Sequence, residues 1–140
     1  MSVREQNLET VAPVFATFSI HQTGGEDDLA DTDIGNAVTL TGDFEIGPAV
    51  NSSIALGKLI ALSLSDIDTG RRVATVQIGG VMTLPITTTY PTVGDRIVGG
   101  ASGTVKQAPA LASNDPAGGN IARGTVLEVN GTSSCTVYMP

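Results

Sequence analysis

The sequence predicts an all-β protein, a small β-barrel or sandwich of about seven to nine strands with an extended N-terminal arm and long loops. The 140 residues include 17 glycines and no tryptophan, and only 15% are charged, which favours strands and turns over a helical bundle. Apolar residues alternate with polar ones in several segments, and clusters of turn-forming residues separate these segments. The length is that of a single domain.

The longest alternating segment is 73–86, whose apolar residues keep one parity on both sides of a Gly79-Gly80 pair. A two-residue hairpin turn at the glycines would send the second half of these residues to the opposite face, because a register change of one residue exchanges the faces of a strand. We therefore predict one long strand, kinked or bulged at the glycines, that serves two parts of a barrel. Its residues on the shared face are Ala74, Val76, Ile78, Met82, Leu84 and Ile86.

Residues 1–33 differ in pattern from the remainder, so we divide the chain into an N-terminal arm with an acidic loop (1–33) and a β-barrel domain (34–140). The stretch 11–20 is apolar but has no clean period, and Pro13 disfavours a central strand. This stretch is either an edge strand of the core or an arm that packs on a neighbouring subunit. The composition of 24–33 predicts a solvated loop.

The barrel domain opens with alternation over 36–48, in which Val38, Leu40, Phe44 and Ile46 share one parity. The next segment, at 54–64, also fits the apolar face of a helix, but its glycine and two serines favour a strand. Turns and loops are predicted at 66–70, 87–95 and 108–122, with a hairpin across 99–103.

The last residues of the sequence form two alternating segments, Gly124–Val129 and Ser133–Met139, on either side of Asn130-Gly131, and this pattern predicts a hairpin. A two-residue turn would leave the apolar residues of the two strands on opposite faces. A loop of three or five residues places Leu127 and Val129 on the face of Cys135, Val137 and Met139. We therefore predict an odd-length loop with a bulge.

The formal net charge of −7 argues against binding to nucleic acid, since no basic stripe is available to neutralise phosphates, and it disfavours an anionic membrane surface for the same reason. The N-terminus lacks the apolar core of a signal peptide, and no segment approaches the length of a membrane span. The lone Cys135 is predicted to be a small buried hydrophobe. We expect synthesis in a cytoplasm.

The sharpest catalytic candidate is Asp68-Thr69-Gly70, which resembles the active-site loop of retroviral-type aspartic proteases. Arg71 and Arg72 follow where that family has a small residue, and a cation there would hold the Asp68 carboxylate ionised. The acidic residues Asp27, Asp28, Asp31 and Asp33 lack the spaced glycine and terminal glutamate of a calcium-binding EF-hand loop. His21 is the only histidine. We therefore expect no enzyme, no metal and no cofactor.

Taken in order, the glycines and apolar residues of 34–139 resemble a known pattern. The order begins with Ile34-Gly35-Asn36-Ala37-Val38 and Thr69-Gly70-Arg71-Arg72-Val73, which leads to Gly80-Val81-Met82-Thr83-Leu84-Pro85. It continues with Val93-Gly94-Asp95-Arg96-Ile97-Val98, Gly103-Thr104-Val105 and a closing Gly124-Thr125-Val126 hairpin. This order is similar to the small β-barrel capsid decoration (cement) proteins of tailed bacteriophages. The match covers about three quarters of the chain.

The resemblance implies a structural virion protein that binds the major capsid protein on the outer face of the shell as a homotrimer and stabilises it. The residues expected at the protein interface are Val11, Val14, Phe15, Phe18 and Ile20. The alternative is that Phe15 and Phe18 simply cap one end of the barrel. Another virion part, such as a tail-tube or baseplate domain, stays open. A carbohydrate-binding module is disfavoured by the lack of tryptophan.

Overall fold

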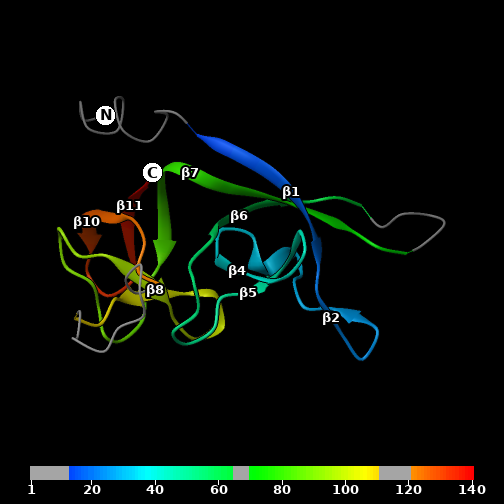
Figure 1. Cartoon of the computed structure of the whole chain (residues 1–140), viewed down its shortest axis with the longest axis horizontal. Helices are drawn as coiled ribbons and strands as arrows, with labels where there is room; N and C mark the ends of the chain where they lie inside the picture. Colours follow the sequence, from blue (N-terminus) through cyan, green and yellow to red (C-terminus); the bar gives the residue numbers. More distant parts are fainter. Residues whose placement is uncertain (1–12, 65–69, 111–120) are drawn as a thin grey trace.

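Five strands close into a β-barrel in the computed structural model, which describes residues 13–64, 70–110 and 121–140 (Figure 1). The strands follow one another around the barrel in the order β1-β5-β4-β6-β7, and pairing of β1 with β7 closes it. The barrel is mixed, because β1 runs parallel to β5 whereas the other neighbours are antiparallel. The five strands are β1 (Val14–Ile20), β4 (Ala37–Gly42), β5 (Glu45–Pro48), β6 (Gly57–Leu62) and β7 (Val73–Pro85).

Further strands lie outside this barrel, on the left and at the lower right of Figure 1. The sheet continues from β7 to β11 (Ser134–Met139) and β10 (Thr125–Asn130). Two separate hairpins pair β2 (Gln22–Thr23) with β3 (Glu26–Asp27) and β8 (Ile97–Gly99) with β9 (Val105–Gln107). The described residues thus form eleven strands and no α-helix, which confirms the all-β prediction. The count exceeds the predicted seven to nine because it includes β2 and β3, which are only two residues long and are too short to leave an alternation pattern in the sequence.

Strand β7 confirms the prediction of one long strand kinked at its glycines. It continues for 13 residues through Gly79 and Gly80, and Gly80 has a φ of 95°. N-terminal to the glycines β7 pairs with β1 and β6, and C-terminal to them it pairs with β11. A bulge opposite β1 lies at the same place, since Val14 faces Gly79 but Phe15 faces Gln77. In Figure 1 the green ribbon of β7 runs along β1 and then turns down beside β11.

The side chain of Gln77 stabilises this kink from within the protein. Its amide nitrogen donates hydrogen bonds of 3.1 Å to the carbonyl oxygens of both Gly79 and Val81. Gln77 is only 8% exposed, so these bonds satisfy carbonyl groups that water reaches poorly. The two sides of the bend are therefore joined by one polar side chain that the alternation pattern does not reveal.

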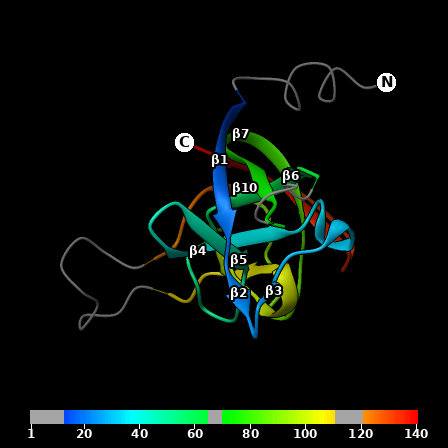
Figure 2. The same ribbon diagram turned by 90° about the vertical axis from the view of Figure 1, so that its right-hand side faces the viewer.

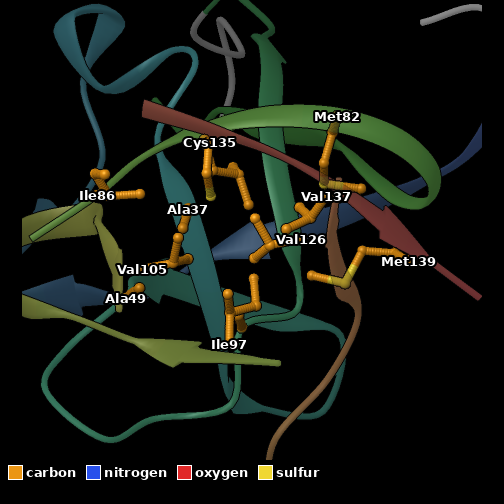
Figure 3. Close-up of a cluster of buried hydrophobic side chains, with 12 residues drawn as sticks. Ala37, Ala49, Met82, Ile86, Ile97, Val105, Val126, Cys135, Val137 and Met139 are labelled. Atoms are coloured by element: carbon orange, nitrogen blue, oxygen red, sulfur yellow. The ribbon is translucent and has the colours of Figure 1, made fainter. Parts of the chain in front are cut away.

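Two apolar clusters fill the interior, and β7 contributes to both. The barrel cluster holds Phe18, Ile20, Leu29, Val38, Ile46, Leu59, Ala74 and Val76, with at least one residue from each barrel strand. The end cluster holds Ala37, Ala49, Ala55, Met82, Leu84, Ile86, Ile97, Val105, Val126, Cys135, Val137 and Met139. Figure 3 shows its side chains converging from several strands onto one interior. The predicted parity of 73–86 is confirmed, because the six apolar residues of its shared face are all buried in or packed against one of these clusters, whereas Val73, of the opposite parity, is 47% exposed.

The C-terminal hairpin confirms the predicted odd loop length and corrects one residue. Asn130 pairs with Ser134, so the loop contains three residues, and Val129 lies opposite Cys135. The bulge falls between Val126 and Glu128, however. It turns Val126 inward and leaves Leu127 36% exposed, so the prediction that Leu127 faces the core is wrong.

The first barrel hairpin departs from the predicted alternation in a similar way. Gly42 pairs with Glu45, and the two residues between them form a turn. Phe44 lies in this turn with a φ of 48° and is 74% exposed, and Leu40 is 52% exposed. Only Val38 and Ile46 of the four equal-parity residues are buried in the barrel. The ambiguous segment 54–64 contains strand β6, as favoured.

Candidate protein interface

The candidate interface begins where β1 enters the barrel beside the kink in β7. Val14 and Phe15 are each 51% exposed, although they belong to a paired strand. Gly79 lies opposite Val14 and lets the valine pack directly on the β7 backbone, since a Cβ added there would lie 3.3 Å from the Val14 Cβ. Figure 2 views the barrel from the side on which β1, in blue, crosses it.

The remaining predicted interface residues separate into two groups. Phe18 is 7% exposed and Ile20 is fully buried, and both pack in the barrel cluster of their own chain. Val11 lies outside the described residues. The stretch that the sequence left open as an edge strand or an arm is thus a barrel strand from Val14 onward, and Val14 and Phe15 are its surface-accessible apolar residues. Phe15 is half exposed and is not a member of the barrel cluster.

An apolar hollow of about 500 Å³ adjoins Val14. Its lining is mainly apolar and comes from five separate parts of the chain: the start of β1, the residue before β6, the kink of β7, the segment before β10 and the end of β11. We call it the kink hollow, and its principal residues are Val14, Leu56, Ile78, Arg123, Tyr138 and Met139. Tyr138 is 45% exposed on the outward face of β11.

The cation in the kink hollow is held by backbone carbonyl groups. The Arg123 guanidinium donates to the carbonyl oxygens of Ala55 at 3.0 Å and Leu56 at 2.8 Å, with a longer contact of 3.5 Å to that of Ile78. Burial lowers the pKa of Arg123 from its ordinary value. The ion pairs found within the described residues are His21–Asp28 and Arg72–Asp31, so no carboxylate in that part of the chain balances Arg123.

A second apolar surface lies at the tip of the β4–β5 hairpin. Phe44 stacks on Phe18 with ring centroids 5.9 Å apart, and together with Leu40 they line a hollow of about 490 Å³. A bulky residue with positive φ is uncommon, and such backbone geometry is often found at functional positions. This surface lies at the other end of β1 from the kink hollow, since Ser19 pairs with Glu45 and Val14 with Gly79.

The titratable groups of the acidic loop pair individually. His21 Nδ1 lies 2.6 Å from Asp28 Oδ2, and this hydrogen bond, with a further one from Thr23, lowers the pKa of Asp28. Asp31 forms an ion pair of 2.7 Å with Arg72. Across the described residues, no group of three or more histidine, cysteine, aspartate or glutamate side chains is arranged to hold a metal ion.

The protease candidate Asp68 lies outside the described residues. Of the two arginines after it, Arg71 donates a hydrogen bond of 3.0 Å to the Ile20 carbonyl, and Arg72 donates one to Asp31. Cys135 is buried in the end cluster, and this burial raises the pKa of its thiol to about 11.

Sequence reasoning missed Arg123, Tyr138 and Phe44. Nothing in the sequence around Arg123 indicates its carbonyl contacts, which join parts of the chain far apart in sequence. Tyr138 could have been found, since it has the opposite parity to the buried residues of its strand. Phe44 could also have been found, because Gly42-Asp43 is a turn signal between alternating segments.

No protein-family model, curated protein or solved structure matched the chain when it was compared with them. The part of the chain that the structure describes contains no helix long and apolar enough to cross a membrane.

Proposed function

We propose that the chain is a structural virion protein that binds the outer face of a bacteriophage capsid as a homotrimer and stabilises the shell.

 The major capsid protein is the expected partner, and the outer capsid surface is the expected location. The resemblance of residues 34–139 to capsid decoration proteins motivates the proposal, and the exposed apolar surface around Val14 and Phe15 supports it.

The single observation that carries most weight is the position of these two residues. Val14 and Phe15 are half exposed on a strand whose later residues are buried, and they adjoin the apolar lining of the kink hollow. Contiguous apolar surface of this kind is typical of a protein-binding site. The titratable side chains near the start of the barrel pair individually, as His21 does with Asp28, which suits a binding protein better than an enzyme.

The net charge of −7 also fits a protein partner. A shell that encloses DNA presents protein on its outer face, so attachment there needs apolar and polar complementarity and no phosphate contacts. An interface of about 800 Å² per partner is enough for a stable complex. Three copies related by a rotation axis close their mutual contacts into a ring, and many copies on one shell strengthen attachment by avidity.

The proposal is tested by sedimenting the full-length protein with empty shells assembled from the major capsid protein of the same genome. The oligomeric mass of the free protein is measured in parallel by analytical ultracentrifugation. We expect the protein to co-sediment with shells at a saturating ratio and to have a trimeric mass. A monomer that stays in the supernatant at all concentrations would contradict the proposal.

Substitutions then locate the surface. Phe15→Ser is expected to weaken shell binding or self-association by at least about tenfold, because it removes a half-exposed apolar contact. Val93→Ser is the matched control, since Val93 is 67% exposed and lies outside the candidate interface. Equal binding by both variants would show that the interface lies elsewhere, with the Phe44 surface as the next region to substitute.

A further inference from the structure

The kink hollow combines two features that call for a particular kind of occupant. Its lining is mainly apolar, and it contains the half-buried guanidinium of Arg123. Charged groups that leave water are normally paired with an opposite charge. Arg123 contacts only carbonyl oxygens among its hydrogen-bond partners in the described residues, so the hollow suits a segment in which an apolar side chain lies next to a carboxylate.

The chain itself contains such a segment in residues 1–12, immediately before the described part begins. Leu8 and Glu9 are adjacent there, and Val11 follows. A chain covers about 3.3 Å per residue when extended, so the five residue steps from Glu9 to Val14 can span about 16 Å. The segment therefore has the reach to contact a neighbouring copy.

A second copy is a better donor of this segment than the same chain. Val14 itself lines the hollow, so the chain's own Glu9 would have to reverse direction within residues 10–13. Pro13 hinders such a reversal, because proline fixes its own φ and disfavours helical backbone at the residue before it. A segment from a neighbour needs no reversal, and reciprocal donation closes a ring when the copies are related by rotation.

We infer that the kink hollow binds the N-terminal segment, residues 1–12, of a second copy of this chain, with Leu8 in the apolar part and Glu9 at Arg123. The inference rests on the self-association in the proposed function and specifies its contact. It does not require that the partner surface be a capsid.

Cross-linking between two differently tagged, co-expressed full-length chains tests this contact. One chain carries Leu8→Cys and the other carries Tyr138→Cys, and a short bis-maleimide joins thiols that lie close together. The native Cys135 is buried with a thiol pKa of about 11, so it does not compete with exposed cysteines. The matched control replaces Tyr138→Cys by Leu40→Cys, which is 52% exposed and lies at the other end of β1.

We expect the Leu8→Cys and Tyr138→Cys chains to be joined at least about fivefold more than the control pair, because the contact holds the two thiols together. A yield no higher than the control overturns the inference. A link formed only within one chain that carries both substitutions also overturns it, since the segment then occupies its own hollow. If Tyr138→Cys lowers the melting temperature, Val14→Cys probes the same hollow from another strand.

A charge substitution gives an independent measurement. Glu9→Arg places a cation against Arg123 and is expected to raise the self-association constant Kd by at least about tenfold, as for close charge pairs in other interfaces. Glu5→Arg makes the same change of charge in the same segment and is the control. Equal effects of the two substitutions contradict the contact of Glu9 with Arg123.

The inference and the proposed function fail separately in these experiments. Cross-linking without shell binding refutes the capsid proposal and leaves the contact between copies intact. Shell binding without cross-linking above the control refutes the contact and leaves the capsid proposal intact.

Discussion

Replacing Gln77 with leucine tests how the barrel maintains the bend in its longest strand. Leucine has a similar volume but no donor, so the carbonyl groups of Gly79 and Val81 both lose a hydrogen bond of 3.1 Å. An unsatisfied buried polar group costs about 1–3 kcal/mol. Both bonds share one nitrogen, and leucine gains some apolar burial in return. We therefore expect the free energy of unfolding to fall by about 2–3 kcal/mol in Gln77→Leu.

Urea denaturation at equilibrium measures this change. The midpoint should fall while the slope m stays constant, because the surface exposed on unfolding is unchanged. Gln22→Leu is the matched control, since its amide donates one hydrogen bond of 2.9 Å to Asp27 in the β2–β3 hairpin, outside the barrel. A loss below about 0.5 kcal/mol in Gln77→Leu, which is the usual range for surface substitutions, would refute a structural role for the amide.

Gln77→Glu sharpens the same test through pH. A carboxylate at position 77 places negative charge against the two carbonyl oxygens, so its folded pKa is raised above the unfolded value of about 4.3. A raised folded pKa means that stability is retained below the unfolded pKa and lost as pH rises through the folded pKa. The deficit of Gln77→Glu relative to the wild type should thus grow from acid toward neutral pH. A deficit independent of pH would contradict this geometry.

Three further predictions follow from packing and titration. Gly57→Ala should lower the free energy of unfolding by at least about 2 kcal/mol in thermal denaturation, because the new Cβ would lie 2.0 Å from the carbonyl oxygen of Gln77. Asp28→Asn should destabilise the protein at neutral pH but have no effect in acid. Hydrogen bonding to His21 lowers the pKa of Asp28 in the folded state. The stability that this bond confers is therefore present above the unfolded pKa of 3.8 and is lost as pH falls through the folded pKa. Cys135 should react with a thiol reagent at pH 8 only on unfolding, since a pKa of about 11 leaves about 0.1% thiolate in the folded protein.

The two substitutions have matched controls, and the thiol prediction has a clear contradicting outcome. Gly42→Ala places its Cβ against only the flexible side chain of Glu45 and should cost much less than Gly57→Ala. Asp43→Asn removes a carboxyl group at the exposed hairpin tip, and a pH profile like that of Asp28→Asn would contradict the role of the His21 contact. Cys135 that reacts equally fast with and without denaturant would show that the end cluster admits reagent.

The sequence was informative wherever one face of a strand is buried. The parity of 73–86 predicted a continuous strand through two glycines, because each inward position fills one of the two clusters. The same reasoning predicted the odd loop between β10 and β11. It failed at Leu127 and Phe44, where a bulge and a two-residue turn each change which side chains face inward. Alternation fixes the parity within a strand but does not locate the residue at which that parity changes.

The candidate interface was predictable only in part. The apolar composition of 11–20 identified the region, but which of its residues are exposed depends on pairing with β7. Val14 and Phe15 are exposed, and Phe18 and Ile20 are not. The kink hollow could not be predicted, because Arg123 and Tyr138 join it only through long-range contacts.

Strand β7 contributes residues to both apolar clusters, and this affects the order in which the protein can fold. The barrel closes only when β1 pairs with a strand synthesised much later, and the end cluster then needs β11 at the very end of the chain. The barrel cluster needs no residue beyond β7, so it can form first during synthesis, whereas the end cluster also needs β10 and β11. Both depend on pairings between segments far apart in sequence, which makes folding slow. Because the two clusters share one strand, we expect them to unfold together in a single cooperative transition.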